Sequence, residues 1–244
     1  MTSPTQVWAH RGASGYAPEN TLPAFELALD QGAEGVEFDV QLSRDGALVV
    51  IHDETLDRTT DGTGRVVGHA LAELRALDAS GGDADYAGVR IPTLDEVLAL
   101  LAPQRLRINI ELKNSVEPYP GLEEKVLASV AEHGLADRVV LSSFADASVR
   151  RLRELAPEIE LAMLYTRPEA RPWRRATLLG AQGFHPPARL VPARLWVRLA
   201  HAAGMAVRPW IVNNPAQLAT MFRWQVDAVF TDTPDVALAL RSAS

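Results

Sequence analysis

The feature that most constrains this chain is a repeated alternation of short apolar runs with longer amphipathic stretches. The short runs have the length and residue types of strands, and most longer stretches carry apolar residues every three or four positions, as helices do. Strands that alternate with helices form a mostly parallel sheet, because each helix returns the chain to the same end of the sheet. The expected strands are residues 7–10, 35–41, 48–52, 106–112, 139–142, 160–164, 181–184, 206–210 and 228–230. The expected helices are residues 23–31, 93–101, 122–133, 145–156, 192–203, 215–223 and 234–241, with a less regular pattern at 168–179.

Nine expected strands are one too many for a barrel that closes with eight. Only residues 43–47 separate the second strand from the third, whereas a parallel crossover needs about a dozen residues or more. Asp45 and Gly46 provide turn residues, so these two strands are expected to form an antiparallel hairpin. The remaining eight predict an α/β fold, a single (β/α)8 TIM barrel over residues 1–244. A small insertion follows the hairpin at about residues 53–92, with a short helix expected at 71–77.

Composition narrows the possible partners and compartments. The formal net charge of −7 argues against a nucleic-acid partner, and the absence of cysteine excludes thiolate chemistry. The first residues show no basic and apolar targeting pattern, and no apolar run reaches the roughly 18 residues of a membrane span. We therefore expect a cytoplasmic protein without stable membrane insertion, whereas its oligomeric state cannot be predicted from the sequence.

Two expected strands end in histidine. The first ends with His10 and Arg11, which places a titratable group beside a fixed cation at the end of the barrel where active sites lie. A structural histidine beside a surface arginine is the alternative interpretation of that pair. The returning hairpin strand ends with His52 and Asp53, and we expect Asp53 to serve as a turn or cap residue.

Three acidic residues lie on expected inner strands. Glu37 and Asp39 share one face of the second strand because side chains alternate along a strand, and two like charges on a buried face repel unless a cation lies between them. Glu111 shares a face with Lys113 on a later strand. The hairpin turn places residues 37–39 opposite about 51–53, which predicts that His52 approaches the acidic residues.

The charges of this group predict its ligands. Three oxygen ligands suit one divalent metal ion, Mg²⁺ or Ca²⁺, although a metal that both histidines bind is a competing interpretation. Three carboxylates, one divalent ion, Arg11 and Lys113 leave one positive charge, which a phosphodiester would balance.

Several sequence blocks resemble the signature blocks of the glycerophosphodiester phosphodiesterase family. They fall in order between residues 8 and 234, and they comprise residues 10–21, 35–41, His52-Asp53, 111–113, Ser143-Phe144, 210–213 and 227–234. Ile211 and Ala228 depart from the family pattern, which more often has threonine and glycine there.

The resemblance implies a barrel of the phospholipase-C-like phosphodiesterase type that hydrolyses a small-molecule glycerophosphodiester to glycerol 3-phosphate and an alcohol. It also implies that His10 and His52 are the general base and acid, in an order that the sequence leaves open. By the same resemblance Glu37, Asp39 and Glu111 match metal ligands, and Arg11 and Lys113 match phosphate-binding residues.

Other roles have two interpretations. Trp210 contacts the glycerol moiety or plugs the barrel, and His185 lines the substrate groove or is structural. Asn20 or Thr21 is expected to cap the first helix, with a supporting role at the site as a lesser alternative for Glu19. Two alternative functions are a lysophospholipase-D-like activity on lipids and a barrel that binds metal or phosphodiester without catalysis. The choice between water and the glycerol hydroxyl as nucleophile also stays open.

Overall fold

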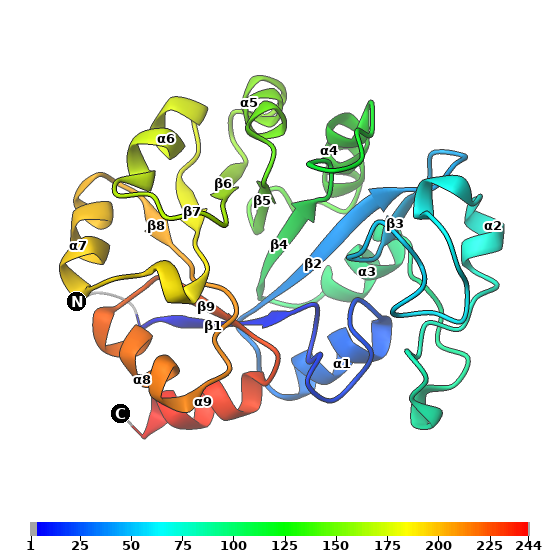
Figure 1. The fold of residues 1–244 in the computed structure, drawn as a ribbon, viewed down its shortest axis with the longest axis horizontal. Coiled ribbons are helices and arrows are strands. Elements are labelled where there is room, and N and C mark those ends of the chain that lie inside the picture. Colours follow the sequence, from blue (N-terminus) through cyan, green and yellow to red (C-terminus); the bar gives the residue numbers. More distant parts are fainter. Residues whose placement is uncertain (1–3, 244) are drawn as a thin grey trace.

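A computed structural model describes residues 4–243 of the chain. Within these residues the strands form a nine-stranded sheet in the order β8-β7-β6-β5-β4-β2-β1-β9, and β3 pairs with β2 outside this path. Helices surround the strands (Figure 1). The strands are β1 Gln6–His10, β2 Gly35–Leu42, β3 Leu48–Val50, β4 Arg107–Leu112, β5 Val139–Ser143, β6 Glu160–Leu164, β7 Gly183–His185, β8 Ala206–Val207 and β9 Ala228–Thr231.

The path of eight strands is parallel throughout, and the hairpin strand β3 runs antiparallel to β2, as predicted. Backbone hydrogen bonds bridge the two ends of the path: Phe230 N donates to Pro209 O at 3.0 Å, and Val212 N donates to Phe230 O at 2.8 Å. The eight parallel strands are thus nearly closed into a barrel, which confirms the predicted TIM-barrel fold.

All eight expected helical segments contain a helix. They are α1 Leu22–Asp30, α3 Leu94–Leu101, α4 Leu122–Glu132, α5 Asp146–Leu155, α6 Pro172–Leu179, α7 Arg194–Ala202, α8 Pro215–Trp224 and α9 Pro234–Ser242. Thr93 caps α3 in the predicted capping box with Glu96. None of the helices in the described part of the chain has the length and apolar content needed to cross a bilayer. The expectation about a targeting segment falls partly on residues 1–3, outside the described residues.

Two expected strands end earlier than predicted. The strand expected at 206–210 ends after Val207, and Pro209, which lacks an N–H group, cannot donate to a ladder. The strand expected at 48–52 ends after Val50, although Ile51 N still donates to Asp39 O of β2 at 3.1 Å. From there the side chain of Gln41 binds the chain, since its Nε2 donates to the backbone oxygens of residues 51, 52 and 53.

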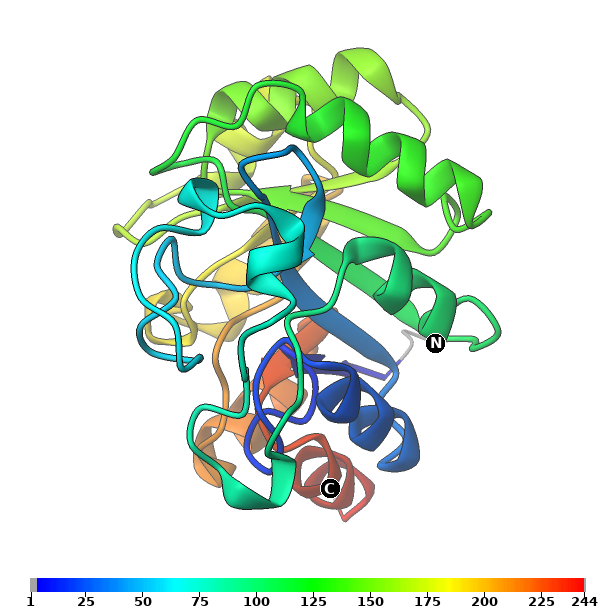
Figure 2. The same cartoon turned by 90° about the vertical axis from the view of Figure 1, so that its right-hand side faces the viewer.

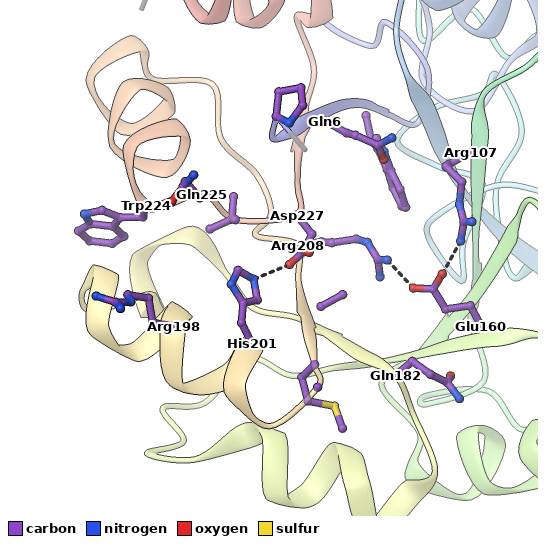
Figure 3. Close-up of a pocket in the computed structure, with 16 residues that line it drawn as sticks. Gln6, Arg107, Glu160, Gln182, Arg198, His201, Arg208, Trp224, Gln225 and Asp227 are labelled. Atoms are coloured by element: carbon purple, nitrogen blue, oxygen red, sulfur yellow. Dashed lines mark hydrogen bonds and ion pairs between the residues drawn. The ribbon is translucent and has the colours of Figure 1, made fainter. Parts of the chain in front are cut away.

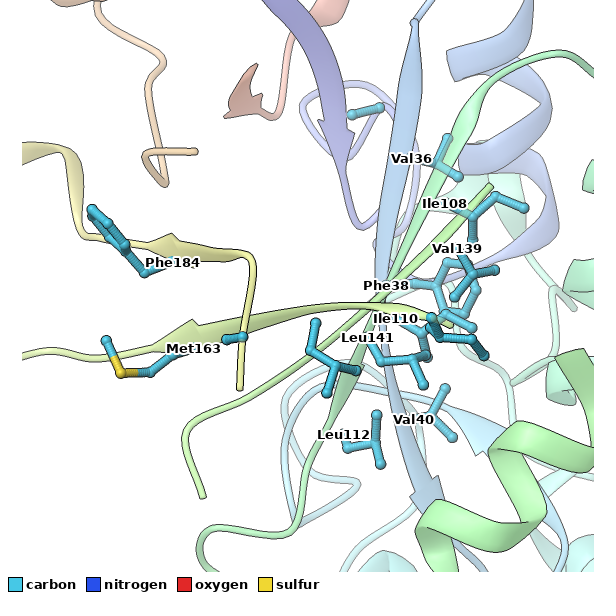
Figure 4. Packing of buried hydrophobic residues seen from close by; sticks show 14 of the residues in the cluster. Val36, Phe38, Val40, Ile108, Ile110, Leu112, Val139, Leu141, Met163 and Phe184 are labelled. Carbon is cyan, nitrogen blue, oxygen red and sulfur yellow. The ribbon is translucent and has the colours of Figure 1, made fainter. Parts of the chain in front are cut away.

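Side-chain alternation on β2 and β4 separates the core from the site. Val36, Phe38 and Val40 are buried in the main hydrophobic cluster with Ile108 and Ile110 of the neighbouring strand (Figure 4). Glu37, Asp39 and Glu111 occupy the intervening positions, so they point to the opposite face of these strands. The apolar residues stabilise the barrel, and the acidic residues are directed into it.

The insertion at residues 53–92 packs on its own small apolar cluster, and Figure 2 looks onto this segment. It contains a helix, α2 Leu71–Leu74, which is shorter than the expected 71–77, and two 3-10 helices, η1 Val66–Gly68 and η2 Ala84–Tyr86. Leu56, Val66 and Leu74 are fully buried, and no large hydrophobic side chain of the insertion is among the exposed ones. The outer surface of the insertion is therefore polar.

Candidate active site

Three acidic side chains meet where β2 and β4 lie side by side. The parallel register pairs Asp39 with Glu111, and Glu37 lies two residues earlier on the same face. One carboxylate oxygen from each lies within 4.8 Å of the others, and all three side chains are buried. Within the described residues, these three carboxylates form the cluster that could hold a metal ion. Neither His10 nor His52 belongs to this cluster. The geometry therefore favours acidic ligands over histidine ligands.

Two cationic side chains and the backbone amide of Arg11 contact the acidic cluster. Arg11 Nε lies 3.3 Å from Asp39 Oδ2, and Arg11 N donates to Glu37 Oε2 at 3.1 Å. Lys113 Nζ lies 3.2 Å from Glu111 Oε1 and 3.9 Å from Asp39 Oδ1. Two positive charges thus face three carboxylates, which leaves an excess of negative charge in a buried place.

The pKa values of the cluster reflect that excess. Burial, opposed by the charge of Lys113 and aided by the charge of Asp39, raises the pKa of Glu111 to about 7. Burial and the charges of Asp39 and Glu111 hold the pKa of Glu37 well above its usual range. Burial would raise the pKa of Asp39 too, but Arg11, His52 and Lys113 outweigh it and lower that pKa to about 2. Oxygen donors crowded in this way fit a hard divalent cation such as Mg²⁺ or Ca²⁺.

Each histidine is bonded to an aspartate through Nδ1. His10 Nδ1 lies 2.7 Å from Asp232 Oδ1, and Asp232 also accepts from Ser14 Oγ at 3.1 Å. His52 Nδ1 lies 2.6 Å from Asp53 Oδ1. An aspartate at Nδ1 fixes the orientation of an imidazole and leaves Nε2 for proton exchange. The expectation that Asp53 is only a turn or cap residue is therefore wrong, because its carboxylate binds the neighbouring imidazole.

A cavity of about 90 Å³ brings the two histidines and the acidic cluster together. Its polar wall and its apolar wall are formed by different groups of residues. The polar wall consists of His10, Arg11, Glu37, His52, Asn109 and Glu111, and the other wall consists of Phe144, Leu164, His185, Trp210, Ile211 and Phe230. Asp39 and Lys113 contact the polar wall through Arg11 and Glu111. All eight site residues predicted from the sequence are thus gathered at one place.

The aromatic side of the cavity has a defined arrangement. Trp210 packs edge-on against Phe144 with ring centroids 5.9 Å apart, and its Nε1 donates to His185 O at 2.8 Å. With the N–H group engaged, the indole of Trp210 offers an apolar surface to the cavity. His185 is fully buried in the same wall, where its ring packs against Phe230.

A larger cavity of about 710 Å³ lies at the opposite end of the barrel, among residues that begin the strands (Figure 3). Its charged groups are largely paired with one another. Arg107 and Arg208 both bind Glu160, and His201 binds Asp227 at 2.9 Å. Because active sites of these barrels lie at the carboxyl ends of the strands, the smaller cavity is the candidate active site.

Three side-chain contacts support the site, and the sequence indicated only a supporting role for Glu19, as a lesser alternative and without its partners. Asn20, expected as a helix cap, donates from Nδ2 to Asp39 Oδ2 at 2.9 Å, and Thr21 is the N-cap residue of α1 without a side-chain capping bond. Glu19 accepts hydrogen bonds from Arg11 and from Arg58, a residue of the insertion that showed no sequence signal at all. The resemblance blocks include Asn20 and Asp232, but they do not reveal which side chains these residues contact.

The site lies at the carboxyl ends of the strands of a TIM barrel. It combines a cluster of three acidic residues, two cations and two imidazoles held by aspartates, and these are the groups that a phosphoric diester hydrolase needs. The sequence profile of the glycerophosphoryl diester phosphodiesterase family matches residues 10–236. The chain belongs to this family and is a hydrolase of glycerophosphodiesters.

Individual relatives are similar over nearly the whole chain. The glycerophosphodiester phosphodiesterase of Caldanaerobacter subterraneus subsp. tengcongensis is 40% identical over 237 residues, which cover 97% of each chain. That of Bacillus altitudinis is 43% identical over 240 residues, which cover 97% of this chain and 98% of the relative.

Solved structures have the same fold. The glycerophosphodiester phosphodiesterase from Agrobacterium tumefaciens aligns with a TM-score of 0.85 and 33% identity, over 96% of this chain and 99% of the other. A phosphodiesterase from Oleispira antarctica, in complex with the product sn-glycerol-3-phosphate, aligns with a TM-score of 0.87 and 34% identity, over 98% and 97%.

Proposed function

We propose that this enzyme hydrolyses glycerophosphodiesters to glycerol 3-phosphate and an alcohol in a reaction that depends on one divalent metal ion, Mg²⁺ or Ca²⁺. The observation that carries the proposal is the placement of two aspartate-held histidines in one cavity with a buried cluster of three carboxylates. The similar Oleispira antarctica structure, which holds sn-glycerol-3-phosphate as its product, supports the choice of product.

The charged residues of the site have separate roles in this proposal. Glu37, Asp39 and Glu111 would hold the metal ion, which would supply neutralisation of the phosphate charge. Arg11 and Lys113 bind the phosphate and stabilise the charge that grows on its oxygens during P–O cleavage. Both cations lie within 4 Å of a carboxylate of the cluster, so a bound phosphate would lie beside the metal ion that these carboxylates would hold.

In the proposed reaction one of His10 and His52 takes a proton from the nucleophile, and the other gives a proton to the departing alcohol. One imidazole accepts through Nε2 the proton of the nucleophile, which is water or the substrate's own glycerol hydroxyl, and the oxygen of the nucleophile forms the new bond to phosphorus. Attack by the glycerol hydroxyl gives a cyclic phosphate, which a water molecule then opens to glycerol 3-phosphate. The bond from phosphorus to the departing alcohol oxygen breaks, and the other imidazole donates its proton to that oxygen. The aspartates at Nδ1 keep both rings oriented toward the cavity and stabilise whichever imidazole is charged.

The apolar wall of the cavity provides the remaining binding surface. We propose that Trp210 packs its indole face against the glycerol moiety, since its N–H group is already bonded to His185 O. The barrel and the insertion over residues 1–244 act as one catalytic unit in this proposal, because the insertion carries His52's immediate neighbours.

A panel assay tests the function. The purified protein is incubated with glycerophosphocholine, glycerophosphoethanolamine and a long-chain lysophospholipid, each with Mg²⁺, with Ca²⁺ and with EDTA. We expect release of glycerol 3-phosphate from the first two substrates and loss of turnover in EDTA. Full activity in excess chelator would remove the metal from the mechanism, and binding of phosphodiester without product would favour a non-catalytic barrel.

The lysophospholipid arm tests the lipid alternative. A lipid-acting enzyme needs apolar surface for contact with the membrane. The insertion beside the site has its large hydrophobic side chains turned inward, within the residues that the structure describes. We therefore expect the glycerophosphodiesters to be preferred, and faster turnover of the lysophospholipid would reverse this conclusion.

A further inference from the structure

Arg58, an arginine near the start of the insertion, binds two carboxylates at once. Its Nε and Nη2 donate to the two oxygens of Asp53 at 2.7 and 2.9 Å. Its Nη1 and Nη2 donate to the two oxygens of Glu19 at 2.7 and 2.8 Å. Both contacts are two-pronged, which is the geometry that the rigid guanidinium group provides and that a lysine cannot reproduce.

The two carboxylates that Arg58 binds are themselves bonded to residues of the active site. Asp53 Oδ1 lies 2.6 Å from His52 Nδ1, and Glu19 Oε1 accepts from Arg11 Nη1 at 2.8 Å. A continuous chain of hydrogen bonds therefore runs from the imidazole through Asp53, Arg58 and Glu19 to the phosphate-binding arginine. Arg58 is its middle link, and it lies outside the cavity wall.

We infer that Arg58 is a positioning residue that fixes His52 and Arg11 relative to each other through Asp53 and Glu19; this inference rests on the proposed roles of His52 and Arg11. Asp53 is next to His52 in the chain, and its side chain is partly exposed. Oδ1 of Asp53 binds the imidazole, and in the contacts described for Asp53 its other carboxylate oxygen, Oδ2, is bound by Arg58 alone. Arg58 occupies that oxygen and so restricts the rotation of the Asp53 carboxylate. Its hydrogen bonds also hold the pKa of Asp53 below the usual range, which keeps Asp53 an acceptor for the imidazole.

A purely structural role for Arg58 would be to fasten the insertion to the barrel. Other contacts already do this: the apolar cluster under the insertion includes Val49 and Ile51 of the hairpin. Arg44, an exposed arginine of the hairpin turn, binds Glu73 at 3.0 Å and Gly68 O at 2.9 Å. Arg44 therefore serves as a matched control, because it fastens the same insertion without reaching the site.

The first experiment compares Arg58→Ala and Arg58→Lys with Arg44→Ala. All are assayed with glycerophosphocholine at saturating metal, together with thermal unfolding and calorimetric titration of the metal. We expect Arg58→Ala to lower kcat about 10- to 100-fold with a much smaller change in KM, because a misoriented proton-transfer group reduces turnover more than binding. Metal affinity and Tm should stay near the wild-type values, Arg58→Lys should fall between, and Arg44→Ala should keep wild-type kcat.

A rescue experiment separates positioning from folding. A groove of about 350 Å³ runs beside Arg58 and Glu19, so a small cation from solvent can reach the place of the missing side chain. Millimolar guanidinium should therefore raise the kcat of Arg58→Ala and leave Arg44→Ala unchanged. If Arg58→Ala fails to fold, the kcat of Arg58→Lys, which retains the charge, is compared with that of Arg44→Ala.

A double substitution tests the route through Asp53. If Arg58 acts through this residue, Arg58→Ala in an Asp53→Asn background should add little to the loss in kcat. Multiplying losses would contradict the route, and so would wild-type kcat in Arg58→Ala or equal losses from Arg44→Ala. An inactive wild-type protein would instead refute the proposed function, so the two failures are distinguishable.

Discussion

His10 and His52 each bind an aspartate through Nδ1, yet the two pairs are built from different parts of the molecule. Asp232 follows β9, which pairs with β1 in the barrel, and it lies 222 residues from His10 in the chain. Asp53 is the residue next to His52 and is held by Arg58 of the insertion. The first pair is positioned by paired strands, whereas the second depends on an ion pair at the surface.

The surroundings of the two imidazoles differ in exposure and in the charge of the groups that bind each aspartate. The side chain of His10 is 11% exposed and that of His52 is 30% exposed. Asp232 has the neutral partners Ser14 and Asn213, whereas Asp53 has a cationic one. The comparison teaches that the same hydrogen bond is held by paired strands in one pair and by a cation of the insertion in the other, and substitutions at both pairs test this difference.

The largest expected effect is the removal of either imidazole. His10→Ala and His52→Ala should each lower kcat by about 10²- to 10⁴-fold, because each removes a proton-transfer group. Metal affinity, measured by calorimetry, should persist in both variants, whereas Glu37→Ala should lose metal binding and activity together. His69→Ala, at a histidine bonded to Arg65 O in the insertion, is the control. Substantial activity in one histidine variant would mean that only the other pair transfers protons.

The next effect is the loss of each aspartate. Asp232→Asn and Asp53→Asn should both reduce kcat by about 10- to 100-fold, because the imidazole loses its orienting charge. The loss should be greater at Asp232, since water can replace the missing partner more readily beside the more exposed His52. Steady-state kinetics on the two variants provides the comparison. A greater loss at Asp53 would show that the insertion, not the barrel, holds the more demanding pair.

A smaller effect concerns how the three acidic residues between the two pairs change the folding stability of the protein. The pKa of Glu111 is about 7 in the folded chain, above its ordinary value of 4.5, so folding binds a proton between these pH values. Without metal, the protein should therefore lose stability as the pH rises from about 4.5 through 7.

Glu111→Gln should weaken that dependence, and the part that remains belongs to Glu37, whose pKa is also raised by burial and by Asp39. In EDTA at pH 8 the variant should be more stable than the wild type by on the order of 1–3 kcal/mol, while it loses metal binding. Urea unfolding at several pH values measures the difference. Equal stability of the two proteins at pH 8 would indicate that the acids do not repel one another in the metal-free chain.

The smallest effect is a change in the pKa of His52. Burial lowers this pKa below 6.5, and the charges of Arg11 and Lys113 lower it further against the opposing effect of Asp39. Lys113→Met removes a cation that disfavours the imidazolium, so the pKa of His52 should rise. NMR titration of the His52 imidazole in EDTA, in the wild type and in the variant, measures the change. A fall in the pKa of His52 would contradict the assigned effect of Lys113.

Local rules were enough to predict most of the fold and much of the site. The short link at residues 43–47 predicted the hairpin, because no parallel crossover fits in it. Side-chain alternation predicted that Glu37 and Asp39 share one face of β2, and the register with β4 brings Glu111 to them. These rules act over a few residues, so they can be applied without knowing the rest of the structure.

The sequence by itself thus determined the strand and helix order, the hairpin and the acidic residues that face the barrel interior. Only the tertiary structure decided that Asp232 lies at His10, that Asn20 binds Asp39 instead of capping α1, and that Arg58 joins Glu19 to Asp53. The physical reason is that backbone periodicity repeats along the chain, whereas contacts between loop side chains arise only when barrel closure brings distant segments together.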